Sequence, residues 1–361
     1  MNNCQLSTVN YQLQKMTFGV LGSGSWGTAL TKILTKNGQP IYWWNRSEKA
    51  IQQIKATHHN PHYLPTAFFD TTNLKLTTDP SEVIKHADCI VIAVPSAYIA
   101  EILSGLDKNI FKGKKIISAI KGILPEENLL LNDYLKKEFN VELENYFAVL
   151  GPCHAEEVAA EKLSYLTFSG IDEVATREVA SYFKTDYLNT VENSDIYGVQ
   201  YAAILKNIYA VGAGLAHGLD YGDNFLSVLI ANSADEMASF LIKVGVKNIQ
   251  VGTLEHDDTE KHKPLNTNYA ASVYLGDLLV TCYSLHSRNR MFGTMIGKGY
   301  SVKTAQLEMS MVAEGYNASK CMYIINQQVR SEMPIAETIY NILWNNLSAA
   351  EGLKHIEDTL V

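Results

Sequence analysis

The sequence predicts an α/β chain in which an N-terminal Rossmann-type, doubly wound sheet is followed by an all-helical C-terminal domain. Three observations lead to this prediction. From Thr17, short β-rich runs alternate with helical stretches, as in a mostly parallel sheet covered on both faces. After about Ser194, long helical stretches continue without a further convincing strand. A glycine-rich turn follows the first strand and opens the first helix.

The expected strands have continuous apolar runs rather than strict alternation, which indicates that both faces of the sheet are buried. These strands are Thr17–Leu21, Pro40–Trp44, Asp88–Val94, Lys115–Ile120, Tyr146–Leu150, Tyr165–Ser169 and Tyr187–Thr190. Helices are expected between them, for example at Trp26–Lys36 and Ser81–His86. In the second half the expected helices are Ile196–Gly218, Phe225–Val244, Tyr269–His286, Lys303–Glu314, Ala318–Gln328 and Ile335–Leu343.

Length and composition fit a two-domain globular protein, since the chain has 361 residues, of which 47% are hydrophobic and 19% charged. We expect a loose leader over 1–16, a dinucleotide-binding domain over 17–195 and a helical substrate-binding domain over 196–361. The segment Thr253–Asn268 is rich in charged residues and His, and it is expected to be a surface loop.

The net charge of −8 offers no general attraction for nucleic acid or an anionic membrane. The longest wholly apolar runs, such as Ile90–Val94, are far shorter than the roughly 20 residues of a membrane span. The five cysteines are scattered without metal-site or disulfide spacing, and the first fifteen residues do not resemble a signal peptide. These features predict a cytoplasmic protein.

The glycine turn Gly22-Ser-Gly-Ser-Trp-Gly27 predicts a site for NAD or NADP. Gly22 permits the tight turn, Gly24 lets the backbone approach a pyrophosphate, and Gly27 lets helix and strand pack closely. The phosphates would meet the helix N-terminus. The alternative is a glycine-containing strand-to-helix turn that binds no ligand.

The end of the second strand bears on the choice between the two cofactors. An Asp or Glu at that place binds the ribose of NAD, whereas this strand ends Trp43-Trp44-Asn45-Arg46. Arg46 can pair with the 2′-phosphate of NADP, so NADP is expected to be accepted. The alternative is a solvated surface arginine stacked on Trp44.

Lys206 lies in an apolar helical stretch, where a lysine either extends its amine to solvent or faces a functional cavity. A buried amine would have a lowered pKa and could exchange a proton with a substrate oxygen. Lys121 and the segment Gly151-Pro-Cys-His-Ala-Glu-Glu157 follow strands, at the sheet edge where such folds bind ligands. These neighbours favour the functional interpretation.

A second polar group follows in the helical half. Asp277 and Thr281 lie on one face of a predicted helix, and Ser287-Arg-Asn-Arg290 comes soon after. An arginine beside Ser and Asn donors suits a phosphate dianion, because its planar fork makes paired charge-assisted hydrogen bonds. The alternative is an ordinary polar helix end.

Together these residues resemble the bacterial NAD(P)-dependent glycerol-3-phosphate dehydrogenases over roughly Thr17 to Leu343. The motifs that carry the resemblance are Gly22-Ser-Gly-Ser-Trp-Gly-Thr-Ala-Leu30, Ala119-Ile-Lys-Gly122, Gly151-Pro-Cys-His-Ala-Glu-Glu157, Leu205-Lys-Asn207, Gly276-Asp-Leu-Leu-Val-Thr-Cys282, Ser287-Arg-Asn-Arg-Met-Phe-Gly293, Val312-Ala-Glu-Gly-Tyr316 and Glu332-Met-Pro-Ile335.

The resemblance implies reversible reduction of dihydroxyacetone phosphate to sn-glycerol 3-phosphate for glycerophospholipid synthesis, by a homodimer. It implies that Lys206 is the general acid and base. It implies that the substrate is surrounded by Lys121, Gly151, Cys153, Lys206, Asp277, Ser287, Arg288 and Asn289, with Arg288 on the phosphate. It implies that the cofactor is lined by Gly22, Gly24, Ser25, Trp26, Gly27, Arg46, Tyr63, Lys121, Ala155, Arg288, Val312 and Glu314.

The chain departs from the family pattern at two places. Cys153 stands where many relatives carry a small hydroxyl or other small residue; because hydride transfer needs no covalent intermediate, we do not expect it to be a nucleophile. The segment Asn268-Tyr-Ala-Ala-Ser-Val-Tyr-Leu275 replaces the glycine-rich approach usual before Gly276.

Two other functions remain open from the sequence. One is a related two-domain dehydrogenase for a hydroxy acid or a sugar nucleotide, which would turn over substrates that lack phosphate. The other is a cofactor-binding sensor without catalysis. No metal site is expected, because His58, His59 and His62 lie in a proline-containing loop without a supporting acid pattern.

Overall fold

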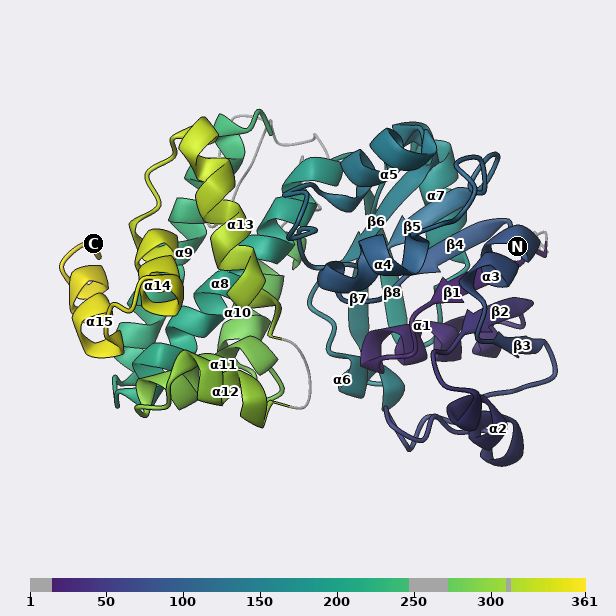
Figure 1. Cartoon of the computed structure of the whole chain (residues 1–361), viewed down its shortest axis with the longest axis horizontal. Coiled ribbons are helices and arrows are strands. Elements are labelled where there is room, and N and C mark those ends of the chain that lie inside the picture. Colours follow the sequence, from purple (N-terminus) through teal and green to yellow (C-terminus); the bar gives the residue numbers. More distant parts are fainter. Residues whose placement is uncertain (1–14, 247–271, 310–312) are drawn as a thin grey trace, which may run out of the picture.

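The computed structural model describes residues 15–246, 272–309 and 313–361. Most of the predicted leader, the charged loop Thr253–Asn268 and Val312 lie outside these residues. Figure 1 shows a sheet-containing half joined to a helical half that continues to the C-terminus. The predicted fold class is confirmed.

One eight-stranded sheet organises the N-terminal half, in the order β3-β2-β1-β4-β5-β6-β7-β8. Its strands are β1 Phe18–Leu21, β2 Ile41–Trp44, β3 Leu74–Thr77, β4 Cys89–Ile92, β5 Lys115–Ser118, β6 Tyr146–Leu150, β7 Ser164–Ser169 and β8 Leu188–Asn193. The first six are parallel; β7 pairs antiparallel with β6, and β8 pairs parallel with β7. The carboxyl ends of β1, β4 and β5 therefore lie side by side at one edge.

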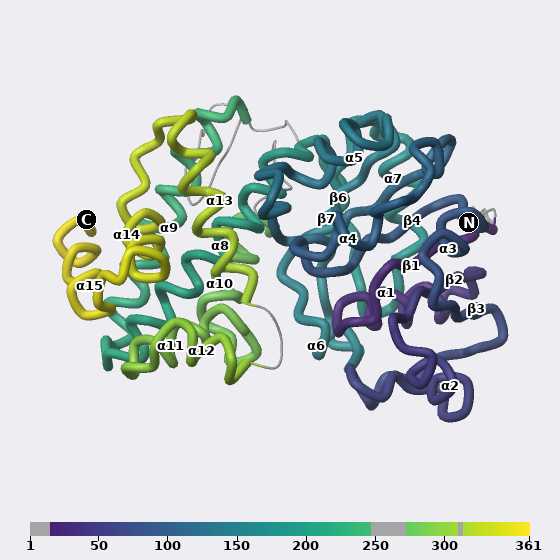
Figure 2. Tube along the Cα trace, viewed as in Figure 1, coloured from purple at the N-terminus to yellow at the C-terminus, as the bar shows by residue number. Residues whose placement is uncertain are grey.

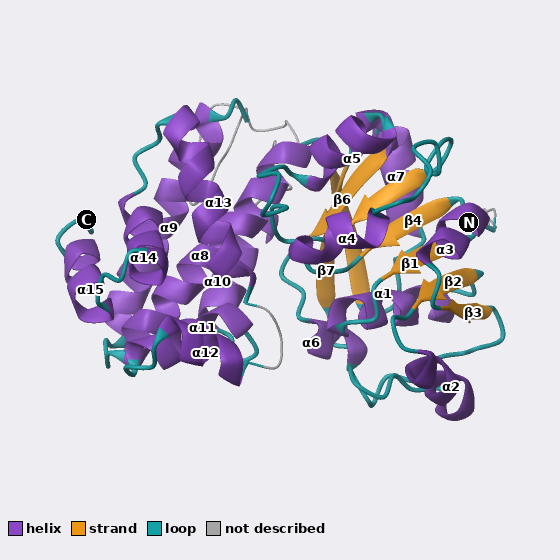
Figure 3. Cartoon of the chain, viewed as in Figure 1, coloured by secondary structure: helices purple, strands orange, loops and turns teal. Residues whose placement is uncertain are grey.

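Helices cover both faces of this sheet (Figure 3). They are α1 Ser25–Lys36, α2 Glu48–Thr57, α3 Pro80–His86, α4 Ile99–Leu103, α5 Leu131–Phe139, α6 Ala155–Ala159 and α7 Glu173–Ser181. Side chains of a strand alternate between the two cores. In β4, Val91 packs in the core that contains Leu30 of α1, while Ile90 packs in the core that contains Val83 of α3. This double burial explains the continuous apolar runs of the strands.

The helical half is built around α8 Ile196–Gly218, whose middle is buried on all sides. The other helices are α9 Asp223–Lys243, α10 Asp277–Tyr283, α11 Arg288–Gly297, α12 Val302–Glu308, α13 Glu314–Val329, α14 Pro334–Trp344 and α15 Ala349–Glu357. A single π-helical turn, Ser272–Gly276, leads directly into α10. The tube in Figure 2 shows α8 running among the other helices of the C-terminal half.

Helices α8 and α11 lie in backbone contact, which small residues make possible. A Cβ atom on Gly214 would lie 2.0 Å from the Arg290 carbonyl oxygen, and one on Gly293 would lie 2.0 Å from the Val211 carbonyl oxygen. Glycine is therefore required on both sides of this crossing. The close approach brings the N-terminus of α11, with Arg288, towards the same helix that carries Lys206.

Helix α9 is the one described helix long and apolar enough to span a membrane by length and composition. Half of its apolar window is buried inside the protein, and Met237, Phe240 and Leu241 lie in the core. Its apolar character is thus accounted for by packing within the helical half.

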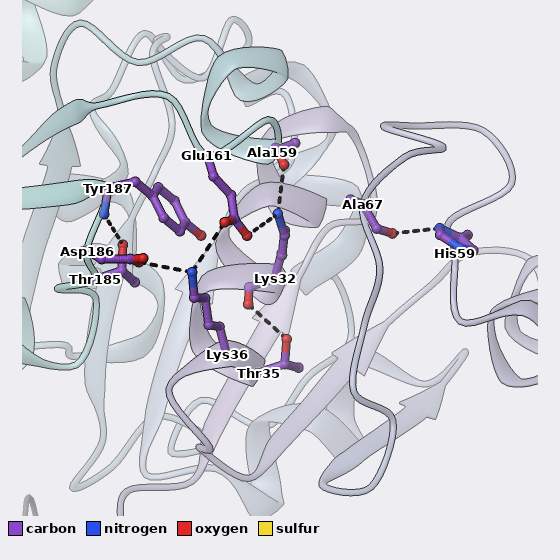
Figure 4. Close-up of polar contacts among 10 residues, drawn as sticks. All are labelled: Lys32, Thr35, Lys36, His59, Ala67, Ala159, Glu161, Thr185, Asp186 and Tyr187. Atoms are coloured by element: carbon purple, nitrogen blue, oxygen red, sulfur yellow. Dashed lines mark hydrogen bonds and ion pairs between the residues drawn. The ribbon is translucent and has the colours of Figure 1, made fainter.

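An ion-pair cluster fastens α1 to the segments that flank α6 and β8 (Figure 4). Lys32 Nζ donates to the Ala159 carbonyl oxygen at 2.7 Å and pairs with Glu161 at 2.9 Å, while Lys36 Nζ pairs with Asp186 at 3.0 Å. Each exposed pair contributes only about 0–1 kcal/mol. The cluster nevertheless joins α1, which follows the glycine turn, to α6, which follows Gly151.

Several predicted elements differ from the structure. Strand β3 was not predicted, and neither were α11 and α15. The expected helix Lys303–Glu314 is confirmed at its start but is too long, because α12 ends at Glu308 and Glu314 begins α13. The expected helix Tyr269–His286 is too long, because α10 ends at Tyr283, where Ser284 turns to an extended conformation.

Candidate active site

The glycine turn has the backbone geometry that its sequence predicts. Gly22 has φ +128°, a region that favours glycine, and its added Cβ would lie 2.5 Å from the Ala93 carbonyl oxygen. A Cβ on Gly27 would lie 2.2 Å from the Gly22 carbonyl oxygen. Gly24 differs, because no described atom lies within 4 Å of the place its Cβ would take. The turn therefore has open space above its middle glycine.

That open space suits a dinucleotide pyrophosphate at the N-terminus of α1, where Ser25 and Trp26 begin the helix. The Trp26 indole Nε1 is buried and has no hydrogen-bond partner among the described residues. Asn60 fixes the turn from below by donating to the Ser23 carbonyl oxygen at 3.1 Å, and it accepts from the Tyr63 backbone amide at 3.3 Å. Tyr63 is thereby held next to the turn.

Arg46 follows β2, beside the turn, and its side chain is exposed. Its neighbour Asn45 is buried, and the Asn45 backbone amide donates to the Thr77 carbonyl oxygen of β3 at 3.0 Å. The backbone that carries Arg46 is therefore fixed, while its guanidinium is available to a ligand on the carboxyl edge of β2.

Lys206 is buried in the middle of α8, with 3% of its surface exposed, rather than extended to solvent. Its Nζ atom donates to Thr281 Oγ1 at 3.0 Å and forms an ion pair with Asp277 Oδ1. Both partners lie on one face of α10, as predicted. The burial and the two contacts support the functional interpretation of this lysine.

Lys121 approaches the same carboxylate from the sheet half. Its Nζ atom lies 3.5 Å from Asp277 Oδ2 and donates to the Gly151 carbonyl oxygen at 3.3 Å. The structure thus joins residues from three separate segments of the chain into one group of two amines and one buried carboxylate.

Burial lowers the pKa of Lys206 to about 7, and the Asp277 carboxylate opposes this effect by favouring the charged amine. The positive charge of Lys121 lowers the pKa further. A group with a pKa near neutrality can both give and take a proton at physiological pH. The site therefore contains an acid–base group of suitable strength.

The turn after β6 forms another wall. Gly151 has φ +134°, and an added Cβ would lie 2.9 Å from the Tyr165 carbonyl oxygen. The Cys153 thiol donates to that same oxygen at 3.0 Å, and burial raises its pKa to about 12. Such a thiol is not a nucleophile at neutral pH. Ala155 begins α6 directly after this turn and is buried.

A chain of amides connects the two halves behind the site. Asn289 donates to Asn207 Oδ1 at 2.8 Å, and Asn207 donates to the Lys121 carbonyl oxygen at 3.0 Å. Ser287 caps α11 by accepting from the Arg290 backbone amide at 3.3 Å. Asn289 and Ser287 are therefore buried supports on either side of Arg288.

Glu314 makes a second connection between the halves. Its carboxylate accepts from the Ser96 hydroxyl at 2.9 Å and from the Ser96 backbone amide at 3.3 Å. Burial raises the pKa of Glu314, while the Arg288 guanidinium opposes that shift. A Cβ on Gly122 would lie 2.5 Å from the Ser96 hydroxyl and 2.8 Å from the Glu314 carboxylate, so glycine is needed there.

Three supporting residues were not among the predicted site residues: Asn60, Ser96 and Asn207. Ser96 had a usable signal, because Val94-Pro95-Ser96 follows β4 at the carboxyl edge of the sheet. Asn207 lies beside Lys206 in a quoted motif. Asn60 had no local signal, since its partner Ser23 is remote in sequence. Within the described residues, no group of three or more His, Cys, Asp or Glu side chains could hold a metal ion.

Comparisons with known proteins agree on one family. Models of the N- and C-terminal parts of NAD-dependent glycerol-3-phosphate dehydrogenase match residues 17–175 and 195–354. The chain is 33% identical over 343 residues to glycerol-3-phosphate dehydrogenase [NAD(P)+] of Enterococcus faecalis, covering 95% of each chain. It is 35% identical over 334 residues to the Bacillus subtilis enzyme of the same name, covering 92% of this chain and 91% of that one.

The fold is similar to a crystal structure of glycerol-3-phosphate dehydrogenase from Coxiella burnetii. The TM-score is 0.83 at 25% identity, and the match covers 95% of this chain and 99% of the other. Both halves of the present chain are therefore included in the similarity.

Proposed function

The chain belongs to the NAD-dependent glycerol-3-phosphate dehydrogenase family, and on that premise we propose how its own residues reduce dihydroxyacetone phosphate to sn-glycerol 3-phosphate and reverse the reaction. The observation that carries the proposal is the contact of the buried Lys206 and Asp277 with each other and with the partly buried Lys121. It combines an acid–base amine with cationic groups suited to a small phosphorylated substrate.

Lys206 is the proton donor in reduction and the proton acceptor in oxidation. The NAD(P) dinucleotide, when bound, supplies or accepts the hydride. The protonated Lys206 amine gives its proton to the carbonyl oxygen as that oxygen gains negative charge, and the Asp277 carboxylate orients the amine. Lys121 adds a second positive charge near the developing alkoxide.

Arg288 holds the substrate phosphate. It begins α11, where the helix N-terminus also favours an anion, and the flanking Ser287 and Asn289 fix the backbone on either side. Gly151 and Cys153 form the opposite wall, where the backbone rather than the thiol faces the substrate. These roles extend the catalytic assignment to specificity for a phosphorylated ketone.

Cofactor binding is assigned to the turn Gly22–Gly27 with Ser25 and Trp26, and to Tyr63, Ala155 and Glu314 around it. The open space over Gly24 and the unpartnered Trp26 indole nitrogen support this assignment. We infer that Arg46 pairs with the 2′-phosphate of NADP, which favours acceptance of NADP beside NAD. Val312 remains a predicted cofactor contact.

The two halves of the chain have separate roles in this proposal. Residues 17–195 act as the dinucleotide-binding domain and 196–361 as the substrate-binding domain, after a leader over 1–16. We infer a cytoplasmic homodimer, and the exposed apolar side chains of Leu285 and Leu307 on the helical half are candidate subunit contacts. Light scattering of the purified protein measures the oligomeric state.

The test of function follows the absorbance of NADPH and of NADH with dihydroxyacetone phosphate as substrate. Dihydroxyacetone and a 2-keto acid serve as matched controls, because the first lacks only the phosphate and the second represents hydroxy-acid dehydrogenases. We expect turnover that depends strongly on the phosphate. Equal turnover of dihydroxyacetone would contradict the role of Arg288, and preference for the 2-keto acid would favour the rival dehydrogenase.

A further inference from the structure

Tyr274 is a buried tyrosine in the π-helical turn that immediately precedes Asp277, with 2% of its surface exposed. Its hydroxyl donates to Asp195 Oδ2, in the segment between β8 and α8. This turn lies in the segment Asn268–Leu275, which the family resemblance marked as a departure from the glycine-rich pattern expected before Gly276. The turn before Asp277 therefore carries a large buried side chain with a defined partner.

Asp195 has a structural task of its own, which fixes the position of the Tyr274 hydroxyl. Its Oδ1 atom caps α8 by accepting from the Gly198 backbone amide at 2.7 Å, while Oδ2 takes the tyrosine. A Cβ on Gly198 would lie 2.7 Å from the Tyr274 hydroxyl and 2.1 Å from Asp195 Oδ2. Glycine at position 198 therefore leaves the space that Asp195 and the Tyr274 hydroxyl occupy.

The same helix α8 contacts the next part of the segment. Eight residues after Gly198, Lys206 pairs with Asp277 and donates to Thr281 at 3.0 Å. The π-turn and α10 are continuous, so this segment is fastened to α8 at two points, one before Asp277 and one at Asp277 itself. Single-turn π-helical insertions occur frequently at functional sites.

We propose that Tyr274 is a positioning residue: held by Asp195, it fixes the π-turn so that the Asp277 carboxylate stays against the Lys206 amine. The inference rests on the proposed function of Lys206 and adds a residue that does not touch the substrate or the cofactor. Loss of the hydroxyl lets Asp277 move away from Lys206, which misorients the proton donor.

The charge surroundings of Lys206 give the direction of the pH effect. Among the described residues, the titratable groups that face it are Asp277, Lys121, His154, Cys153 and Cys282. Asp277 is the acid among them and the one group that favours the charged amine at neutral pH, since burial raises the pKa of both thiols to about 12. Displacing Asp277 therefore lowers the pKa of Lys206.

The first experiment compares Tyr274→Phe with Tyr146→Phe. Tyr146 is an equally buried tyrosine whose hydroxyl donates to Gln200 of α8 at 2.8 Å, a hydrogen bond that involves neither the π-turn nor α10. For Tyr274→Phe we expect kcat for reduction to fall roughly tenfold, as misplacement of catalytic groups does, with the KM for NADPH within about twofold of wild type. The falling limb of kcat against pH moves to lower pH. Tyr146→Phe should change neither kcat nor the pH at which kcat falls.

A double-mutant cycle with Asp277→Asn separates positioning from a general structural role. If Tyr274 acts through Asp277, Tyr274→Phe has little further effect on kcat in the Asp277→Asn background. Additive losses, an unshifted pH limb, or equal losses in Tyr146→Phe overturn the inference.

A measurement that needs no substrate tests the role of Tyr274 separately from the proposed function. Hydrogen exchange in the segment 272–283 should be at least about fivefold faster in Tyr274→Phe, and unchanged in Tyr146→Phe, because a lost anchor raises local opening. Unchanged exchange in Tyr274→Phe overturns the inference whatever the substrate. If the wild-type enzyme does not reduce dihydroxyacetone phosphate, the proposed function is refuted but the inference about Tyr274 is not.

Discussion

Replacing Lys206 with methionine tests the central chemical assignment with little change in shape. The side chain is buried in the apolar middle of α8, and methionine has a similar length without the charge. Asp277 would keep Lys121 as an ionic partner, since Lys121 Nζ lies 3.5 Å from its Oδ2 atom. The variant should therefore fold, and its melting temperature checks that it does.

The expected loss comes from the missing proton donor. A positioned general acid contributes about 10²–10⁴-fold to a rate, which corresponds to about 3–5 kcal/mol of activation free energy. Lys206 bonds to Thr281 and Asp277 of α10, so we expect the Kd for NADPH, measured by fluorescence titration, to remain within about twofold of wild type.

The pH dependence of kcat is a second, independent test of the acid–base role of Lys206. With a pKa lowered by burial to about 7, the wild-type amine is protonated below that pH and neutral above it. Reduction needs the protonated form, so its kcat falls as pH rises through about 7, whereas kcat for oxidation rises over the same interval. Both limbs should disappear in Lys206→Met. A variant kcat within about threefold of wild type, or limbs that persist, would refute the assignment.

Three other predictions follow from the site and the core. Arg288→Ala should raise the KM for dihydroxyacetone phosphate roughly 30- to 100-fold, because a charged hydrogen-bonding partner is lost; an unchanged KM would contradict the phosphate role. Arg46→Ala should raise the KM for NADPH about tenfold and leave that for NADH nearly unchanged; equal effects on both would remove the 2′-phosphate assignment. Glu236 accepts hydrogen bonds from the Ile335 and Ala336 backbone amides. Burial raises the pKa of Glu236 to about 7. Between the ordinary pKa of a glutamate and pH 7, the native state therefore binds more protons than the unfolded state. Relative to Glu236→Gln, wild type should therefore lose about 3 kcal/mol of unfolding free energy as pH rises through that window, measured by urea unfolding at both ends; a pH-independent difference would show that the carboxyl stays ionised.

Much of the sheet could be predicted because local sequence determines it. Buried strands such as β4 are continuous apolar runs between turn residues, and α8 has the predicted bounds because Asp195 caps its start. Strand β3 was not predicted, because Leu74-Lys-Leu-Thr77 is short, only partly buried and at the sheet edge. Its pairing with β2 depends on tertiary structure that four residues do not encode.

The site was only partly accessible from the sequence for a similar reason. Lys121 and Asp277 are 156 residues apart, and their meeting follows from the way α8 and α10 pack against the sheet half. Residue types and the family resemblance named both, but no spacing predicts their contact. The Tyr274–Asp195 bond was not predicted, because the two residues are 79 positions apart and neither lies in a pattern that points to the other.

The core that surrounds α8 is shared by both halves of the molecule. Leu205 of α8 and Leu150 of β6 belong to one continuous cluster of buried side chains, together with Ile90 from the middle of the sheet. A fragment ending after β8 would thus expose the apolar surface that α8 covers, and it would be prone to aggregation. Unfolding of one half should carry the other with it in a single cooperative transition. Neither half is then a transferable module: swapping substrate domains between relatives would require exchanging the sheet residues beneath α8 as well.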